Sequence, residues 1–324
     1  MHNQPANNTM TKANDPQLAS TVMMIRPAGF ESNPLTAASN RFQGKSPLAP
    51  DVQHATALRE FDGLVDNLRN AGIEVIVIDD TPEPHTPDAI FPNNWISMHA
   101  DGRVVIYPME AENRRTERRD DVIDYLVSDG GRLVSEVIDL SDHEANGHYL
   151  EGTGSMVLDR ANRIAYACVA TRTHLDPLGD FAQRMGYDVV AFDAVDSSGV
   201  QIYHTNVLMN VGEKLAVICD EAIPRADQRE AVLARLRETG HEVVHLSYEQ
   251  LGAFAGNMLE LRNDKGERVI AMSQTAYNSL NEEQRATLTA NGRVISAAID
   301  TIESSAGGSV RCMLAEVHLP ADQP

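Results

Sequence analysis

The sequence lacks the features that mark several large classes of protein. Only three cysteines occur among 324 residues, and none are closely paired, so there is neither a disulfide framework nor a zinc-ligand spacing. No stretch approaches the ~18 apolar residues that a membrane-spanning helix needs. The first 20 residues are polar and lack the apolar core of a signal peptide. We therefore expect a cytoplasmic protein in which residues 1–20 form a disordered tail.

Positive charge is also scarce. Lysine and arginine number 27 against 47 aspartates and glutamates, which gives a formal net charge of −20 and a pI near 4.8. Such a chain repels phosphate backbones, so nucleic acid is not an expected partner. With 42% hydrophobic residues, the 324-residue chain can form one large domain or two ordinary ones.

One short phrase recurs along the chain: an aromatic or small residue, a polar pair, then an apolar run that closes into a hairpin. Its copies read FPNNWISM from Phe91, YLEGTGSM from Tyr149, YHTNVLM from Tyr203, FAGNMLEL from Phe254 and SVRCMLAEV from Ser309. One aligned column holds Asn94, Gly152, Asn206, Asn257 and Cys312, which are separated by 58, 54, 51 and 55 residues. A period on the order of 50 residues is typical of stacked units that cannot bury their apolar faces alone.

Each copy continues in the same way, with a turn, a second strand, a helix and a further strand. The opening segment from Thr21 completes a fifth unit with the C-terminal strand. Closing five such units into a ring removes free sheet edges. The pattern predicts an α/β fold, a five-bladed pseudo-symmetric α/β-propeller, as a single catalytic domain over residues 21–324. An ordinary two-domain α/β protein is the alternative, but the recurring helix and trailing strand argue against it.

Equivalent positions of a ring converge on its axis, and here they bear Cys312, His204 and Glu151. A thiol, an imidazole and a carboxylate together can attack a planar carbon, transfer protons to a leaving group and orient the imidazole. The run Gly307–Gly308–Ser309 before the cysteine lets backbone approach the site closely. The sequence therefore predicts a cysteine-dependent enzyme that needs neither a metal nor a cofactor.

The phrases MIRPAGFESN, TPDAIFPNNW, YLEGTGSM, YHTN and GGSVRCM resemble those of the guanidino-group-modifying enzymes, the pentein or amidinotransferase superfamily, over residues 22–320. Within it the chain most resembles the arginine-deiminase-related branch of citrulline utilisation hydrolases. The resemblance implies that Cys312 is the nucleophile, His204 the general acid and base, and Glu151 its carboxylate partner. A homodimer is common among the proteins that it resembles.

The resemblance also suggests how a free amino acid is held. Asp88 resembles the carboxylate that meets the substrate's α-amino group, and Arg114 and Arg172 resemble the arginines that bind its α-carboxylate. The physical chemistry agrees, because a guanidinium fork pairs bidentately with a carboxylate.

Two asparagines distinguish this chain from the relatives that bind cationic guanidinium groups. Those enzymes place aspartates where this sequence has Asn94 and Asn206. An amide offers both a donor and an acceptor, so it suits the neutral ureido group of citrulline, whereas a buried guanidinium needs compensating charge. Asn257, in a blade with no other catalytic signal, is expected to serve only the backbone.

The sequence therefore favours a hydrolase of carbon–nitrogen bonds that converts citrulline to ornithine, ammonia and carbon dioxide through an S-carbamoyl intermediate. One alternative keeps the fold and acts on arginine or dimethylarginine, giving citrulline. Another alternative is a non-catalytic propeller that binds a partner, like the ribosome anti-association factors of this architecture. The convergent thiol, imidazole and carboxylate argue against that last reading.

Overall fold

The computed structural model describes residues 15–322, which contain five three-stranded sheets. In each sheet the middle strand is antiparallel to one neighbour and parallel to the other, and we call each sheet with its helices a blade. From the first blade to the fifth, the sheets consist of β3 (Ile96–Met98), β4 (Arg103–Ile106) and β5 (Glu136–Asp139); β6 (Val157–Asp159), β7 (Ile164–Cys168) and β8 (Asp188–Phe192); β9 (Met209–Val211), β10 (Leu215–Ile218) and β11 (Glu242–His245); β12 (Leu259–Arg262), β13 (Arg268–Ser273) and β14 (Arg293–Ala297); and β15 (Ala315–Glu316), β1 (Thr21–Arg26) and β2 (Glu74–Asp79).

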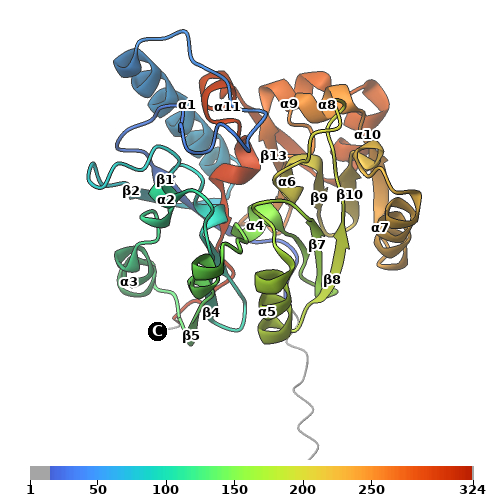
Figure 1. Ribbon diagram of the computed structural model, residues 1–324, viewed down its shortest axis with the longest axis horizontal. Coiled ribbons are helices and arrows are strands. Elements are labelled where there is room, and N and C mark those ends of the chain that lie inside the picture. Colours follow the sequence, from blue (N-terminus) through green and yellow to red (C-terminus); the bar gives the residue numbers. More distant parts are fainter. Residues whose placement is uncertain (1–14, 323–324) are drawn as a thin grey trace, which may run out of the picture.

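One longer helix joins the two parallel strands of every blade. These helices are α3 (Asp120–Ser128), α5 (Leu175–Met185), α7 (Ala226–Glu238), α10 (Glu282–Asn291) and α1 (Pro50–Asn70). The shorter helices are α2 (Glu112–Arg115), α4 (Gly152–Ser155), α6 (Thr205–Leu208), α8 (Tyr248–Gly252), α9 (Gln274–Ser279) and α11 (Asp300–Ala306). In Figure 1, α1, α3, α5 and α7 lie at the periphery, whereas α4 and α6 lie near the centre.

Helix α5 illustrates how the sequence specifies these elements. Its apolar residues Leu178, Phe181 and Met185 recur at helical spacing and are buried against the sheet of the same blade and its neighbour. The helix ends where Gly186 takes a φ of 70°, a left-handed conformation that costs glycine little. The expected alternation of hairpin, helix and strand is confirmed in all five blades.

The blades are arranged as a closed ring. Strand β3 contacts α4 of the second blade, β6 contacts β9, β9 contacts β12, and β15 of the fifth blade contacts β3 of the first. The 3-10 helix η4 (Val310–Met313), which precedes β15, contacts β13 of the fourth blade. The predicted five-bladed propeller is therefore confirmed.

Two sequence expectations need correction. Residues 1–14 of the expected tail lie outside the described range. The expectation is wrong for residues 15–20, because Asp15, Gln17, Leu18 and Ala19 are buried. The side chain of Gln17 donates to backbone carbonyls of both the second and the third blade, at 3.0 and 2.9 Å. This segment therefore belongs to the folded domain.

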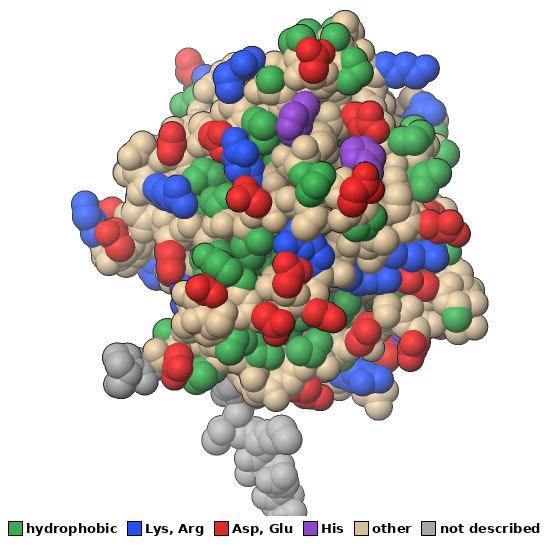
Figure 2. Space-filling view, turned by 90° about the vertical axis from the view of Figure 1, so that its left-hand side faces the viewer, with side chains coloured by type: hydrophobic (Ala, Val, Ile, Leu, Met, Phe, Trp, Pro, Cys, Tyr) green, Lys and Arg blue, Asp and Glu red, His purple; other side chains and the backbone are tan. Residues whose placement is uncertain are grey.

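In the first blade, the single helix that the repeat predicts after the second strand is in fact two helices, α2 and α3, separated by a turn. The break allows Glu117 to point inward, where it is 3% exposed. No helix in residues 15–322 is long and apolar enough to cross a membrane. On the face that Figure 2 shows, acidic and basic side chains are interspersed.

Candidate active site

The repeated phrases meet at the centre of the ring as short helical turns. These turns are η1 (Pro92–Asn94), α4, α6 and η4, and α4 contacts both η1 and α6 while η1 contacts η4. Close approach depends on glycine: a Cβ on Gly152, whose φ is +46°, would lie 2.3 Å from the Asn93 carbonyl oxygen. The convergence of repeat positions expected from the sequence therefore occurs.

His204 and Glu151 form a buried pair on adjacent blades, with His204 Nε2 2.8 Å from Glu151 Oε2. Burial opposes ionisation of Glu151, but Arg172, His204 and Arg114 outweigh it and hold the pKa of this carboxyl well below its usual range. Burial also lowers the pKa of His204 to about 4, despite the neighbouring carboxylate. At neutral pH the pair is thus a carboxylate and a neutral imidazole. A neutral ring that donates its Nε2 proton to Glu151 leaves Nδ1 free to act as a base.

Cys312 lies in η4 and is 3% exposed. Two side-chain amides flank its sulfur: Asn206 Nδ2 lies 3.4 Å and Asn257 Nδ2 3.2 Å from Sγ. The interpretation of Asn257 as a purely backbone-serving residue is therefore wrong, although it does also donate to the Asn206 carbonyl at 3.0 Å. The other two cysteines, Cys168 and Cys219, are buried in the core, and burial raises the pKa of each thiol to about 12.

Arg114 is buried beside Asn94, whose Oδ1 accepts from its Nη1 at 2.9 Å. Its guanidinium fork is occupied by Glu117, with Nε–Oε1 and Nη2–Oε2 distances of 2.9 Å each. Burial raises the pKa of Glu117 to about 7 against the attraction of Arg114. Sequence analysis did not identify Glu117; its spacing of three residues from Arg114 on a helical turn was the available signal.

Arg172 is also buried, and its guanidinium stacks 4.7 Å from the centroid of the Tyr203 ring. It contacts Glu151 at 3.5 Å and donates to Ser39 Oγ at 2.7 Å and to the Thr36 carbonyl at 3.3 Å. The last two partners belong to the irregular segment 27–49, which we call the covering loop. Arg172 therefore ties Glu151 to the loop.

Asp88 lies on the same side of the site, under the covering loop. Its Oδ2 accepts from Asn33 Nδ2 at 2.7 Å and lies 3.7 Å from Arg114 Nε. Its Oδ1 is buried and has no hydrogen-bond partner among residues 15–322. This oxygen is available to a donor that enters the site.

A cavity of about 10 Å³ lies between these groups, large enough for about one water molecule. Its lining comprises Asn40, Asp88, Phe91, Asn94, Arg114, Arg172, Tyr203, His204, Ala306, Gly307, Gly308 and Cys312. Six of the eight predicted site residues line this cavity, and the seventh, Glu151, forms an ion pair with Arg172 in its wall. The eighth, Asn206, lies against the sulfur without lining the cavity.

The covering loop closes this cavity. Asn40 Nδ2 donates to the Ala306 carbonyl at 2.9 Å, and the Gly44 amide donates to the Ser304 carbonyl at 2.8 Å. A second cavity of about 450 Å³ lies beside the first, shares Tyr203 with it, and is lined by Ser39 and Glu110 among others. Residues of the covering loop line both cavities, Ser39 the larger one and Asn40 the smaller one.

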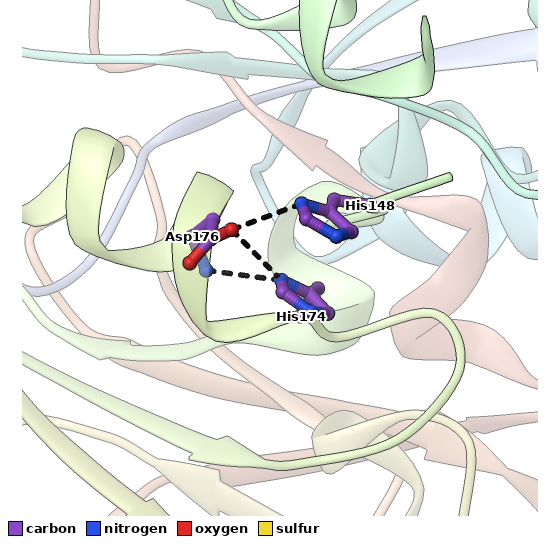
Figure 3. Close-up of side chains that lie close together, drawn as sticks. All are labelled: His148, His174 and Asp176. Carbon is purple, nitrogen blue, oxygen red and sulfur yellow. Dashed lines mark hydrogen bonds and ion pairs between the residues drawn. The ribbon is translucent and has the colours of Figure 1, made fainter. Parts of the chain in front are cut away.

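A histidine pair lies just outside the site (Figure 3). His148 Nδ1 is 3.0 Å and His174 Nδ1 3.8 Å from Asp176 Oδ2, so the three residues could offer ligands to a metal ion. The two rings are stacked at 3.7 Å with an interplanar angle of 6°. A metal lies near the plane of an imidazole that binds it, and one ion cannot lie in two parallel planes this far apart. His174 Nδ1 also accepts from the Asp176 amide as the helix cap. As arranged, these residues fit an ion pair at a helix start.

Comparison with known proteins places this site in context. The family model described as "N,N dimethylarginine dimethylhydrolase, eukaryotic" matches residues 26–319. No curated protein matches the sequence significantly. Among solved structures, apo ArgZ, an arginine dihydrolase of cyanobacteria, is 17% identical with a TM-score of 0.71; the match covers 93% of this chain and 41% of ArgZ. The chain thus spans about two fifths of that relative.

Two further structures contain covalent adducts. One is the N-terminal domain of an asparagine-to-serine variant of ArgZ, covalently bound to a reaction intermediate. It is 18% identical to this chain with a TM-score of 0.70, and the match covers 93% of this chain and 99% of that domain. A dimethylarginine dimethylaminohydrolase variant bearing an S-methyl-L-thiocitrulline adduct is 16% identical, with a TM-score of 0.63 and coverage of 92% and 99%. These likenesses show the shared fold. By its family match, the chain belongs to the dimethylarginine dimethylhydrolase family, among the guanidino-group-modifying enzymes of the pentein fold.

Proposed function

We propose that this protein hydrolyses the ureido group of citrulline, giving ornithine, ammonia and carbon dioxide. Cys312 is the nucleophile, His204 the proton-transfer group, and Glu151 the carboxylate that orients it. The buried His204–Glu151 contact of 2.8 Å supports this assignment, because it fixes the ring and leaves one nitrogen free for proton transfer.

The observation that carries the choice of substrate is the pairing of the buried charges. Glu117 is held bidentately by Arg114, and Glu151 is held by His204 and Arg172. These carboxylates are already compensated, so a neutral ureido group can enter without leaving a charge unpaired. Asn94 lines the cavity, and its amide can meet a C=O or an N–H. The resemblance described above implies an aspartate at this position in the enzymes that bind guanidinium.

The amino-acid end of the substrate would meet Arg172 and Asp88. Two of the contacts of Arg172 are with Ser39 and Thr36 of the covering loop, and a substrate carboxylate could replace them when the loop moves. The free Oδ1 of Asp88 could accept from the α-ammonium group. Arg114, whose fork is filled by Glu117, would act through the positive charge that it brings to the cavity wall.

The reaction has two steps. The thiolate of Cys312 attacks the ureido carbon, the C–NH₂ bond breaks, and ammonia leaves with a proton supplied through His204, so that the ornithine side chain remains attached as an S-carbamoyl group. One water molecule, deprotonated by His204, then attacks the same carbon and breaks the C–S bond. The released carbamate loses carbon dioxide to give ornithine. Citrulline and one water are thus consumed for each ornithine, ammonia and carbon dioxide formed.

A second candidate keeps the same residues and acts on arginine or methylated arginine. The buried, unpartnered Oδ1 of Asp88 favours it, because a cationic guanidinium would compensate this carboxylate. ArgZ, which shares the fold, is an arginine dihydrolase. The cytoplasmic location and the homodimer expected from the sequence stay predictions.

The test is product analysis. Purified protein is incubated separately with citrulline, arginine and dimethylarginine, and ammonia and amino-acid products are quantified beside a Cys312→Ala control. Ornithine from citrulline, lost in the variant, is the expected result. Activity confined to arginine or dimethylarginine would overturn the choice of substrate and leave the nucleophile in place. Equal activity of the Cys312→Ala protein would overturn the mechanism.

A further inference from the structure

Three equivalent positions of the sequence repeat meet at one atom. Asn206 from the third blade and Asn257 from the fourth both direct Nδ2 at the sulfur of Cys312 from the fifth, at 3.4 and 3.2 Å. Both asparagines are buried, and neither lines the substrate cavity within the described part of the chain. They therefore lie behind the sulfur, on the side away from an entering substrate.

The orientation of the Asn257 amide follows from a second contact. Its Nδ2 also donates to the backbone carbonyl of Asn206 at 3.0 Å. Turning the amide by 180° would place its oxygen against that carbonyl oxygen, so the nitrogen must face this side. One N–H then meets the carbonyl, and the other meets the sulfur. The sulfur of Cys312 is thus an acceptor in this contact, as a thiolate is.

The amide oxygens show what this arrangement costs. Oδ1 of Asn206 and Oδ1 of Asn257 are both buried and have no hydrogen-bond partner among residues 15–322. Leaving a buried acceptor unpaired destabilises a fold, and most native acceptors are paired. Two such oxygens on the two side chains that touch one sulfur indicate that the amides are arranged to serve that sulfur.

We propose that Asn257, together with Asn206, is a positioning residue that holds Cys312 as a hydrogen-bond acceptor and so stabilises its thiolate. Donors to the charged form of an acid favour ionisation, and the contact strengthens when the sulfur becomes charged. The inference rests on the proposed function only in taking Cys312 as the nucleophile.

The charged and titratable groups around the sulfur offer it little positive charge, so the two amides matter more. The groups that face the cavity or pack behind η4 are Tyr203, His204, Asp88, Arg114, Arg172 and Arg311. Burial lowers the pKa of His204 to about 4, so the ring supplies no positive charge at neutral pH. Arg114 is bound to Glu117, Arg172 to Glu151 and Arg311 to Glu316. Among residues 15–322, the side-chain donors that contact the sulfur directly are the two amides.

The experiment measures the rate of iodoacetamide alkylation at Cys312 as a function of pH, with the modified cysteine identified by peptide mass spectrometry and no substrate present. Asn257→Leu removes the donors at nearly constant volume. Asn210→Leu is the matched control, because Asn210 is a buried amide of the third blade that donates to the Met258 carbonyl of the fourth blade and does not contact the sulfur.

We expect Asn257→Leu to move the midpoint of the alkylation profile upward by about one pH unit, which lowers the rate about tenfold on the acid side, as loss of a hydrogen bond to a charged group predicts. The control should keep the midpoint of the unaltered protein. A folded Asn257→Leu protein with an unchanged midpoint would overturn the proposal. If that variant does not fold, Asn206→Leu decides in the same way through its separate contact. Since the assay uses no substrate, a failed citrulline assay leaves its result intact.

Discussion

Gly154 provides a direct test of the geometry around His204, the proposed proton-transfer group. A Cβ at this position would lie 2.5 Å from Asn94 Nδ2 and 2.8 Å from His204 Nδ1. Ordinary contacts between such atoms are about 3.5 Å, so a single methyl group is about 1 Å too close to one side chain and about 0.7 Å too close to the other. The φ of Gly154 is not in the left-handed region, so the backbone itself accepts alanine.

Gly154→Ala should therefore push His204 and Asn94 out of place while leaving the fold intact. A displacement near 1 Å in a reacting group can cost about 100-fold in rate. We expect kcat for ornithine formation to fall by about that factor, and the melting temperature to change by a few degrees. The matched control is Gly179→Ala, since a Cβ there meets nothing within 4 Å. A Gly154→Ala enzyme with activity within twofold of the unaltered protein would refute this account of the site.

Three further predictions follow from buried charges and from the covering loop. Glu117→Gln leaves Arg114 without its bidentate carboxylate partner. We expect the free energy of unfolding, measured by urea titration, to fall by about 3 kcal/mol. An unchanged free energy would show that the ion pair is dispensable. Because the pKa of His204 is lowered to about 4, the unfolded chain binds more protons than the folded one between pH 4 and the ordinary pKa of 6.5, and the free energy of unfolding should rise with pH across this range. His204→Gln should reduce the slope of this rise by at most about 1.4 kcal/mol per pH unit. An identical slope in the variant would contradict the lowered pKa of His204. Asn40→Ala removes the contact with the Ala306 carbonyl that holds the loop, so alkylation of Cys312 should accelerate severalfold with no shift in its pH midpoint; an unchanged rate would mean that the loop does not control access.

Much of the fold could be predicted from the sequence because the same pattern of residues recurs along it about every 50 residues. The aligned column that contains Asn94, Asn206 and Cys312 specifies five equivalent turns, and ring closure brings equivalent turns together whatever their details. The buried pair of His204 and Glu151 follows from the same symmetry.

The missed features depend on contacts that the repeat does not encode. Glu117 points inward only because the helical stretch breaks after α2. The repeat brings Asn257 near Cys312, but it does not encode the direction of the Asn257 amide, which donates to the sulfur. The covering loop has no regular pattern, and its role follows from hydrogen bonds of Ser39 and Asn40 to distant residues. Such contacts are set by three-dimensional packing, and a spacing such as the three residues between Arg114 and Glu117 does not establish them by itself.

The closing strand of the ring has a consequence for the synthesis of the protein. Strand β15 begins three positions after Cys312 and pairs with β1, which is among the first parts of the domain to leave the ribosome. Four blades can therefore emerge with His204 and Glu151 in place, yet Cys312, the proposed nucleophile, and the strand that completes the ring are synthesised together as the last parts of the fifth blade. A chain released a few residues before Ala315 would have an open sheet edge in β1, and one released before Cys312 would have no thiol at the centre. Catalytic competence is thereby coupled to completion of the last blade.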